Sequence, residues 1–151
     1  MYEVYERMDH VHDIAIDDRL ELDHLQREKG RFKAISQSGA EVRVFLDRGH
    51  TLQIGEILKS QCGQHITVIG AEEPVVTARC DDWEIFSRAC YHLGNRHVKL
   101  QVGKKWLRMT PDHVLEELLI GLGLSTQREV AVFLPESGAY SSSSHVHSHS
   151  H

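Results

Sequence analysis

The end of the chain, residues 145–151, alternates histidine with serine or valine in the order HVHSHSH. A short His-rich tract is a compositional pointer to metal binding, and imidazole suits nickel, copper and zinc. A purification tag is the alternative, but commercial tags are unbroken histidine runs and this tract alternates. We therefore expect His145, His147, His149 and His151 to bind a divalent metal, with a role in capture and local buffering more than in selectivity.

A second candidate is the string Gly94-Asn95-Arg96-His97, at the junction of a predicted helix end and a predicted strand. A single histidine at a helix C-terminus more often interacts favourably with the helix dipole than it binds a metal. Read alone, the string leaves both roles open for His97.

The three cysteines, Cys62, Cys80 and Cys90, are an odd number with no CxxC pair. This disfavours a disulfide framework and a Cys-rich zinc site. Cys90 lies on the apolar face of a predicted helix, so we expect it in the core, and Cys62 lies in a glycine-containing turn, so we expect it exposed. Cys80 precedes two aspartates and could meet a soft metal, but a buried or idle thiol is the favoured interpretation.

Composition excludes several classes of protein. Hydrophobic residues make up 40% and charged residues 26% of the 151, which is ordinary globular usage. The net charge of −5 argues against nonspecific nucleic-acid binding. No apolar run is long enough for a membrane helix, and the first residues do not read as a signal peptide. We expect a cytoplasmic protein, with no enzyme motif such as a phosphate loop or His-Glu-x-x-His.

The elements that must position these residues fall into two halves. Residues 1–71 read as short strands, such as Phe32–Ile35 and Val42–Leu46 around a turn at 36–39. No convincing capped helix is found there, and only the stretch 19–29 is ambiguous between a strand and one helical turn. We therefore predict a small all-β domain over 1–71.

After a predicted linker at 71–74, the pattern changes to strands alternating with helices. The expected elements are a strand at 75–79, a helix from 83 capped by Asp81 or Asp82 and ended at Gly94, strands at 98–102 and 106–109, a helix capped by Thr110 with Pro111 first and ended by Gly123, and a strand at 129–134. This βαββαβ order predicts a ferredoxin-like domain over 72–138. The fold class is α+β, with a Ser/His-rich tail over 139–151 that we expect to be disordered.

These residues together resemble the UreE family of urease accessory proteins. The resemblance rests on YHLGNRH at 91–97, DHVL at 112–115 and the His-rich tail, and it runs over nearly the whole chain. It implies a homodimeric nickel metallochaperone that delivers Ni²⁺ to the urease apoprotein complex together with the urease accessory GTPase. It further implies an N-terminal domain resembling a peptide-binding module and a C-terminal domain that dimerises and binds nickel through His97. Zn²⁺ and Cu²⁺ are the expected competitors.

One departure from the family concerns the second helix. Some relatives carry His-x-His at its start, whereas here the segment is Pro111-Asp112-His113, so His113 is a weaker candidate ligand. His92 is weaker still, because five residues separate it from His97 and place it roughly 140° away around a helix.

One imidazole per chain is a poor metal site, but an isologous two-fold contact would bring two copies of His97 together. Two imidazoles leave nickel under-coordinated, so water or tail histidines must complete the site, and an incomplete site can hand its metal onward. The alternative function is general nickel, zinc or copper buffering without a urease client.

Two other classes are disfavoured. An RNA-binding module would need stacking aromatics, which the strand at 98–102 lacks. A hydrolase built on His97 and His113 would need about three fixed ligands.

Overall fold

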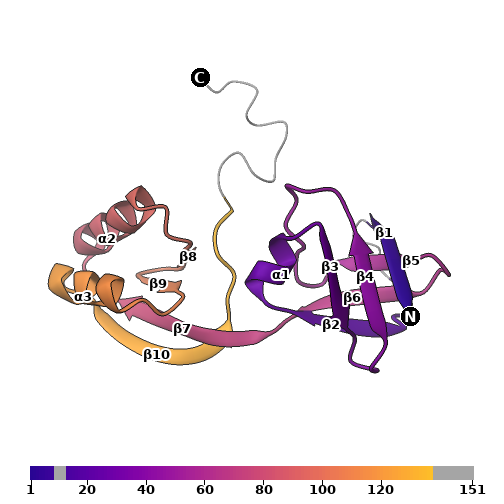
Figure 1. The fold of residues 1–151 in the computed structure, drawn as a ribbon. Helices are drawn as coiled ribbons and strands as arrows, with labels where there is room; N and C mark the ends of the chain where they lie inside the picture. Colours follow the sequence, from indigo (N-terminus) through magenta and orange to yellow (C-terminus); the bar gives the residue numbers. More distant parts are fainter. Residues whose placement is uncertain (9–12, 138–151) are drawn as a thin grey trace, which may run out of the picture. The chain divides into compact units, whose positions relative to one another are not determined.

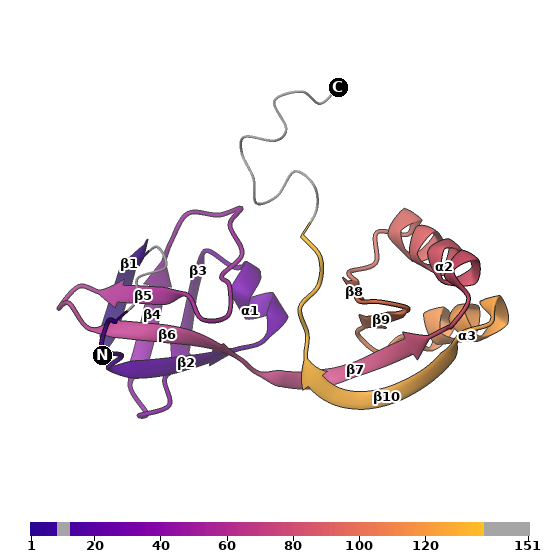
Figure 2. The ribbon, with the colours of Figure 1, turned by 180° about the vertical axis from the view of Figure 1, so that it is seen from behind.

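The computed structural model describes residues 1–8 and 13–137, and the chain divides into two compact units, with the boundary between Ala71 and Glu72. Figures 1 and 2 show the two units from opposite sides. The predicted class, α+β, is confirmed. The tail at 139–151, which the sequence predicts to be disordered, lies outside the described residues. Among the described residues, no helix is long and apolar enough to cross a membrane.

The first unit is built on one six-stranded sheet in the order β2-β6-β5-β1-β4-β3. Its strands are β1 (Tyr2–Met8), β2 (Asp18–Leu22), β3 (Arg31–Ile35), β4 (Glu41–Phe45), β5 (Ile57–Ser60) and β6 (His65–Gly70). The two edge strands, β2 and β3, approach each other. The N–H of Gln37, just after β3, donates to the carbonyl oxygen of Arg19 in β2 at 2.9 Å. The sheet is therefore nearly closed around a core that Val4, Leu20, Val44 and Val68 typify, each without exposed surface.

This unit contains a short capped helix, α1 (His24–Glu28), so the prediction of an all-β domain without a capped helix is wrong. The helix lies in the stretch 19–29, where one helical turn is the alternative that the sequence leaves open. The Asp23 side chain accepts from the Gln26 N–H at 2.8 Å, and the Gln26 side chain accepts from the Asp23 N–H at 3.0 Å. This reciprocal pair is a capping box. Five residues are too few to show an apolar period, so only the Asp-x-x-Gln spacing could have revealed the helix.

A buried carboxylate joins β2 to the turn after β3. The Ser36 hydroxyl donates to Asp18 at 2.6 Å, the Arg19 N–H donates to it at 2.8 Å, and Ser38 donates through both its hydroxyl and its N–H. Burial alone would raise the pKa of Asp18, but these hydrogen bonds outweigh it and lower the pKa to about 2. The ionised form of Asp18 therefore stabilises this part of the first unit.

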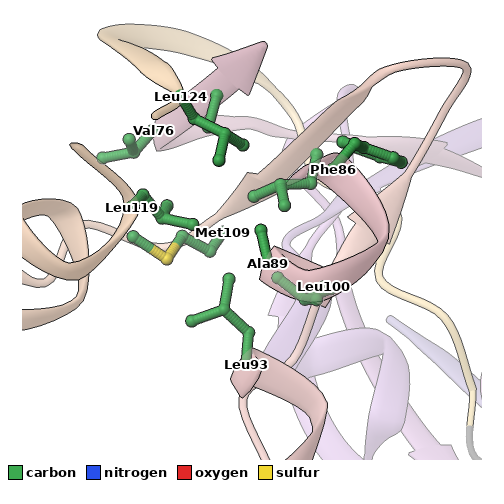
Figure 3. Packing of buried hydrophobic residues seen from close by; sticks show 10 residues of the cluster. Val76, Phe86, Ala89, Leu93, Leu100, Met109, Leu119 and Leu124 are labelled. Atoms are coloured by element: carbon green, nitrogen blue, oxygen red, sulfur yellow. The ribbon is translucent and has the colours of Figure 1, made fainter. Parts of the chain in front are cut away.

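The second unit has the predicted βαββαβ order. Its elements are β7 (Glu72–Arg79), α2 (Trp83–Asn95), β8 (Gln101–Val102), β9 (Trp106–Met109), α3 (His113–Leu122) and β10 (Ser125–Val132). The sheet order is β10-β7-β9-β8, with every pair antiparallel. Figure 3 shows Ala89 and Leu93 of α2 meeting Met109 of β9 and Leu119 of α3 in the core beneath the two helices.

Several predicted boundaries in this unit are wrong. The expected linker at 71–74 is largely strand, because β7 already begins at Glu72 and pairs with β10 through Pro74. A proline is tolerated there because β7 does not pair with β9 until Val76, so Pro74 lies where the strand has one neighbour. The predicted strand at 98–102 shortens to β8 because the Val98 N–H closes the end of α2 instead. The last strand begins earlier than predicted and ends at Val132.

The start of α2 agrees with the prediction, and the start of α3 differs from it. Asp82, and not Asp81, caps α2, and its side chain accepts from the N–H groups of Glu84 and Ile85. Asp112, and not Thr110, caps α3, and its side chain accepts from the Leu115 N–H at 3.1 Å. Aspartate at the cap position satisfies a backbone donor that the helix itself leaves free.

Candidate metal site

His97 lies immediately beyond α2 and adopts a left-handed backbone conformation, with φ at +59°. Its N–H donates to the Gly94 carbonyl oxygen at 3.0 Å, and the Val98 N–H donates to the Leu93 carbonyl oxygen at 3.1 Å. This pair of bonds, with Leu93 and Val98 both in the core, is a Schellman ending of the helix. The residue in the left-handed position of that ending is His97.

The second helix of the unit ends in the same way but with glycine. At the end of α3 the Gly123 N–H donates to Ile120 and the Leu124 N–H to Leu119, and Gly123 has φ of +109°. The expectation that Gly94 ends α2 is wrong, because Gly94 lies within the helix. The spacing of two apolar residues, Leu93 and Val98, around a left-handed residue could have located the true ending.

A left-handed conformation costs about 1 kcal/mol for a residue with a side chain and little for glycine. Asparagine, aspartate and histidine are the residues that tolerate it best. His97 therefore occupies a position where glycine would satisfy the backbone better, and its side chain is exposed. A backbone position that retains a side chain against its conformational preference is grounds for a functional hypothesis about that side chain.

The other two candidate histidines of the domain lie on the helices. His92 is half-buried in the last turn of α2, where its ring packs edge-on against Tyr91 with centroids 5.4 Å apart. His113 is the first residue of α3, and its side chain, 80% exposed, lies 3.4 Å from Glu117. The carboxylate of the nearby Glu116 accepts a hydrogen bond from Arg128, and this bond lowers its pKa.

The part of one chain that the structure describes does not assemble a metal site. Within residues 1–8 and 13–137, no three or more His, Cys, Asp or Glu side chains lie close enough together to hold a metal ion. His97, His92 and His113 are thus not gathered into one site, and the tail residues His145, His147, His149 and His151 lie outside the described part of the chain. The ligand roles of all seven histidines stay predictions.

The cysteines do not add to the site. Cys90 packs against the core of the second unit, as predicted, and burial raises the pKa of its thiol, which disfavours the thiolate that binds metals. Cys62 is exposed, as predicted, and Cys80 is partly buried beside the same core. All three are free thiols.

Exposed apolar side chains lie on both helices of the second unit, α2 and α3. Tyr91 is 68% exposed, Val114 is 71% exposed and Ile120 is 57% exposed. Single exposed apolar residues are normal on a protein surface. With Trp83, which is 50% exposed, the two adjacent helices carry four, and together these offer an apolar contact for another molecule.

The fold and this site define a small two-unit α+β protein with one strained surface histidine beyond a helix end. The model of the UreE urease accessory protein N-terminal domain matches residues 3–71, and that of the C-terminal domain matches residues 73–151. The chain therefore belongs to the UreE family of urease accessory proteins, so the resemblance seen in the sequence is confirmed. Membership implies a role in urease maturation, as an accessory protein and not as the urease enzyme itself.

Individual relatives match along nearly their whole length. A protein named urease accessory protein UreE from Marinomonas sp. (strain MWYL1) is 55% identical over 150 residues, which cover 99% of each chain. Proteins of the same name from Alteromonas mediterranea and Psychromonas ingrahamii are 54% identical over 143 residues and 52% identical over 151 residues. These matches cover 95% and 100% of this chain and 92% and 99% of the two relatives.

Proposed function

We propose that the protein is a nickel metallochaperone, which binds Ni²⁺ and delivers it for assembly of the urease metal centre. Its partners would be the urease apoprotein complex and the urease accessory GTPase. The observation that carries the proposal is the exposed imidazole of His97, retained at a left-handed position that glycine would fill at lower cost. Membership of the UreE family supports urease as the destination of the metal.

The nickel site would be shared by two copies of the chain. An isologous contact places the same patch of each copy against the other, so a residue near the two-fold axis meets its own copy. Tyr91, which lies six residues before His97 and is 68% exposed, is one apolar side chain that could contribute to such a contact. A homodimer built there would supply two imidazoles to one nickel ion.

Two imidazoles leave nickel with open coordination positions, whether the geometry is square-planar or octahedral. Water or the tail histidines, His145 to His151, would fill them. A site held by few protein ligands gives up its metal more readily than a closed structural site, which suits delivery. Zn²⁺ and Cu²⁺ would compete, because imidazole ligands bind both and Cu²⁺ more strongly than Ni²⁺.

The second candidate function is buffering of nickel, zinc or copper with no dedicated urease client. The alternating His tract supports it, because a tract of this kind can chelate without any partner protein. The two candidate functions make different demands on the chain. Delivery of nickel to urease requires His97, whereas buffering requires only the tail histidines.

The test is activation of purified apo-urease by the nickel-loaded protein, with the accessory GTPase and GTP present. We expect His97→Ala to reduce the rate of activation at least tenfold, and replacement of all four tail histidines by alanine to reduce it less. A His97→Ala protein that activates urease as fast as the parent would contradict the proposal. Activation by nickel salt alone at the same rate would favour simple buffering.

A cytoplasmic location, and the lack of nucleic-acid, membrane and catalytic roles, stay predictions that accompany this function.

A further inference from the structure

The carbonyl end of α2 is engaged by a cation. Arg96 follows the helix directly, and its Nη1 donates to the carbonyl oxygen of His92 at 3.0 Å. His92 is one of the last four residues of α2, whose carbonyl groups lack a partner within the helix itself. A helix C-terminus carries a partial negative charge of about half an elementary charge, which a nearby cation offsets. Arg96 therefore lies where it offsets the negative end of α2.

Without that cation, the same end of the helix would favour a bound metal ion. His97 is the next residue after Arg96, so their Cα atoms are about 3.8 Å apart. The side chain of His97 is exposed just beyond the helix. A divalent cation held by this imidazole would be attracted by the negative end of α2. The guanidinium of Arg96 cancels part of this attraction, and its positive charge repels the ion.

A second cation, Lys99, lies on the exposed side of the same segment. Lys99 follows His97 by two residues, and two residues span at most ~7 Å. Its neighbours on either side, Val98 and Leu100, pack in or against the core of the second unit. Lys99, like His97, is thus left exposed, and its ammonium group adds to the positive charge around the imidazole.

The segment around His97 has no acidic residue of its own. Residues 85–111 contain six lysines and arginines and no aspartate or glutamate, although the whole chain has a net charge of −5. In the ranges 1–8 and 13–137, Arg96 makes no ion pair with a carboxylate. Glu136, whose N–H donates to the carbonyl oxygen of Leu100, adds a carboxylate to this stretch. Arg96 and Lys99 outnumber it, so the positive charge beside His97 is only partly compensated within the described residues.

We propose that Arg96 and Lys99 weaken the hold of His97 on a divalent metal ion and so speed the release of the ion to an acceptor. This inference rests on the proposed function, in which His97 binds nickel for delivery. A site that retains its metal gains from acidic neighbours, because opposite charges attract. Cationic neighbours lower the affinity for every divalent ion and leave the imidazole itself unchanged. Arg96 and Lys99 thus act on the metal through charge alone.

The expected size of the effect follows from Coulomb's law. In water at ~0.1 M ionic strength, one unit charge about 10 Å from a divalent ion changes its binding constant by a little under twofold. A nickel ion shared by two chains meets four such charges, two from each chain. Their removal should therefore tighten nickel binding about five- to tenfold. The effect should grow at ~0.01 M ionic strength and vanish at ~1 M, where the screening length is about 3 Å.

The test removes the two charges in the full chain and keeps polar side chains. The glutamine pair, Arg96→Gln with Lys99→Gln, leaves an amide that can still donate to the His92 carbonyl oxygen. The charge-conserving pair, Arg96→Lys with Lys99→Arg, is the rescue. Arg88→Gln is the matched control, because Arg88 lies eight residues and about 12 Å earlier along α2, where its Nη2 is 3.5 Å from Glu84. Calorimetry measures nickel affinity at the tightest site, and transfer to excess EDTA measures the release rate, each at three ionic strengths.

We expect the glutamine pair to bind nickel about five- to tenfold more tightly and to release it more slowly, with both effects fading as salt is added. The charge-conserving pair and the Arg88→Gln control should behave like the parent. A role of Arg96 in capping α2 alone predicts the opposite sign, because a loosened helix end would weaken binding at every ionic strength. Weaker or unchanged binding in the glutamine pair would overturn the inference.

His97→Ala in the full chain separates this inference from the proposed function. Tight nickel binding that survives His97→Ala would defeat the proposed function itself. Tight binding that depends on His97 but has the same affinity in the glutamine pair as in the parent would overturn this inference alone.

Discussion

Replacing His97 by glycine and, separately, by alanine tests both its imidazole as a metal ligand and its left-handed backbone conformation. Both substitutions remove the imidazole, so both should abolish tight nickel binding. They differ in the backbone, because glycine enters the left-handed region freely and alanine does not. At φ of +59° we therefore expect His97→Gly to be more stable than His97→Ala.

The size of the difference follows from the conformation. In an ordinary helix interior, alanine is more stable than glycine by about 1 kcal/mol. At a left-handed position the order reverses, because the Cβ of alanine crowds the following carbonyl oxygen at a cost of roughly 1–2 kcal/mol. Glycine also gives the unfolded chain more conformational entropy, which offsets part of this cost. The free energy of unfolding of His97→Gly should therefore exceed that of His97→Ala by about 1 kcal/mol. The two variants thus report the backbone conformation independently of the metal.

Urea unfolding followed by tryptophan fluorescence measures this difference in the second unit alone, because both tryptophans, Trp83 and Trp106, lie there. Gly123→Ala is the matched control, since it puts a Cβ at the equivalent left-handed residue of α3. It should lose about 1 kcal/mol and keep tight nickel binding. An alanine variant at position 97 as stable as the glycine variant would refute the left-handed assignment, and tight nickel binding in both would refute the ligand role.

Three further outcomes are expected. Deleting residues 145–151 should remove the weaker nickel equivalents and leave the dimer and the tightest site, as measured by calorimetry and light scattering; loss of the dimer would contradict this. Because the pKa of Asp18 is about 2 when folded and near 3.9 when unfolded, its stabilisation is present above pH ~4 and disappears as the pH falls from ~4 to ~2. Asp18→Asn should destabilise the protein at pH 7 and remove that part of the acid dependence in urea unfolding; an unaltered pH profile would refute the assignment. Asp112→Ala should lose about 1 kcal/mol with the cap of α3, yet keep its nickel affinity; a parallel loss of affinity would make Asp112 a ligand.

The order of elements in the second unit was predictable because each element carries its own local pattern. The apolar positions Phe86, Ala89 and Leu93 recur at helical spacing and are buried together. The ends were less predictable, because tertiary contacts decide them. Val98 looks like a strand residue, but its N–H closes α2 instead.

The same contrast holds for the candidate site. Sequence reasoning found His97 and its place beyond a helix end, because glycine and polar residues mark that boundary. It assigned the helix ending to Gly94, since glycine is the usual residue there. The left-handed state of His97 depends on Leu93 and Val98 both reaching the core, which is a property of the packed unit.

The segment after β10, Phe133 to Glu136, illustrates a third kind of limit on prediction from the sequence. Phe133 and Leu134 extend the apolar pattern of β10, so the sequence alone predicts a strand through them. In the structure β10 ends at Val132, and the next residues cross to β8. The Leu134 N–H donates to the side-chain oxygen of Gln101, 33 residues earlier, and no local pattern predicts a hydrogen bond over that separation.

The central claim, a nickel site shared by two copies of His97, is tested most directly by the stoichiometry of tight binding. The protein would be truncated after Ser137 so that no tail histidine contributes. Its oligomeric mass would be measured by light scattering, and the nickel bound per chain by equilibrium dialysis. The account predicts one tightly held nickel ion for every two chains, and none after His97→Ala. One tight nickel ion per chain, or tight binding that survives His97→Ala, would contradict it.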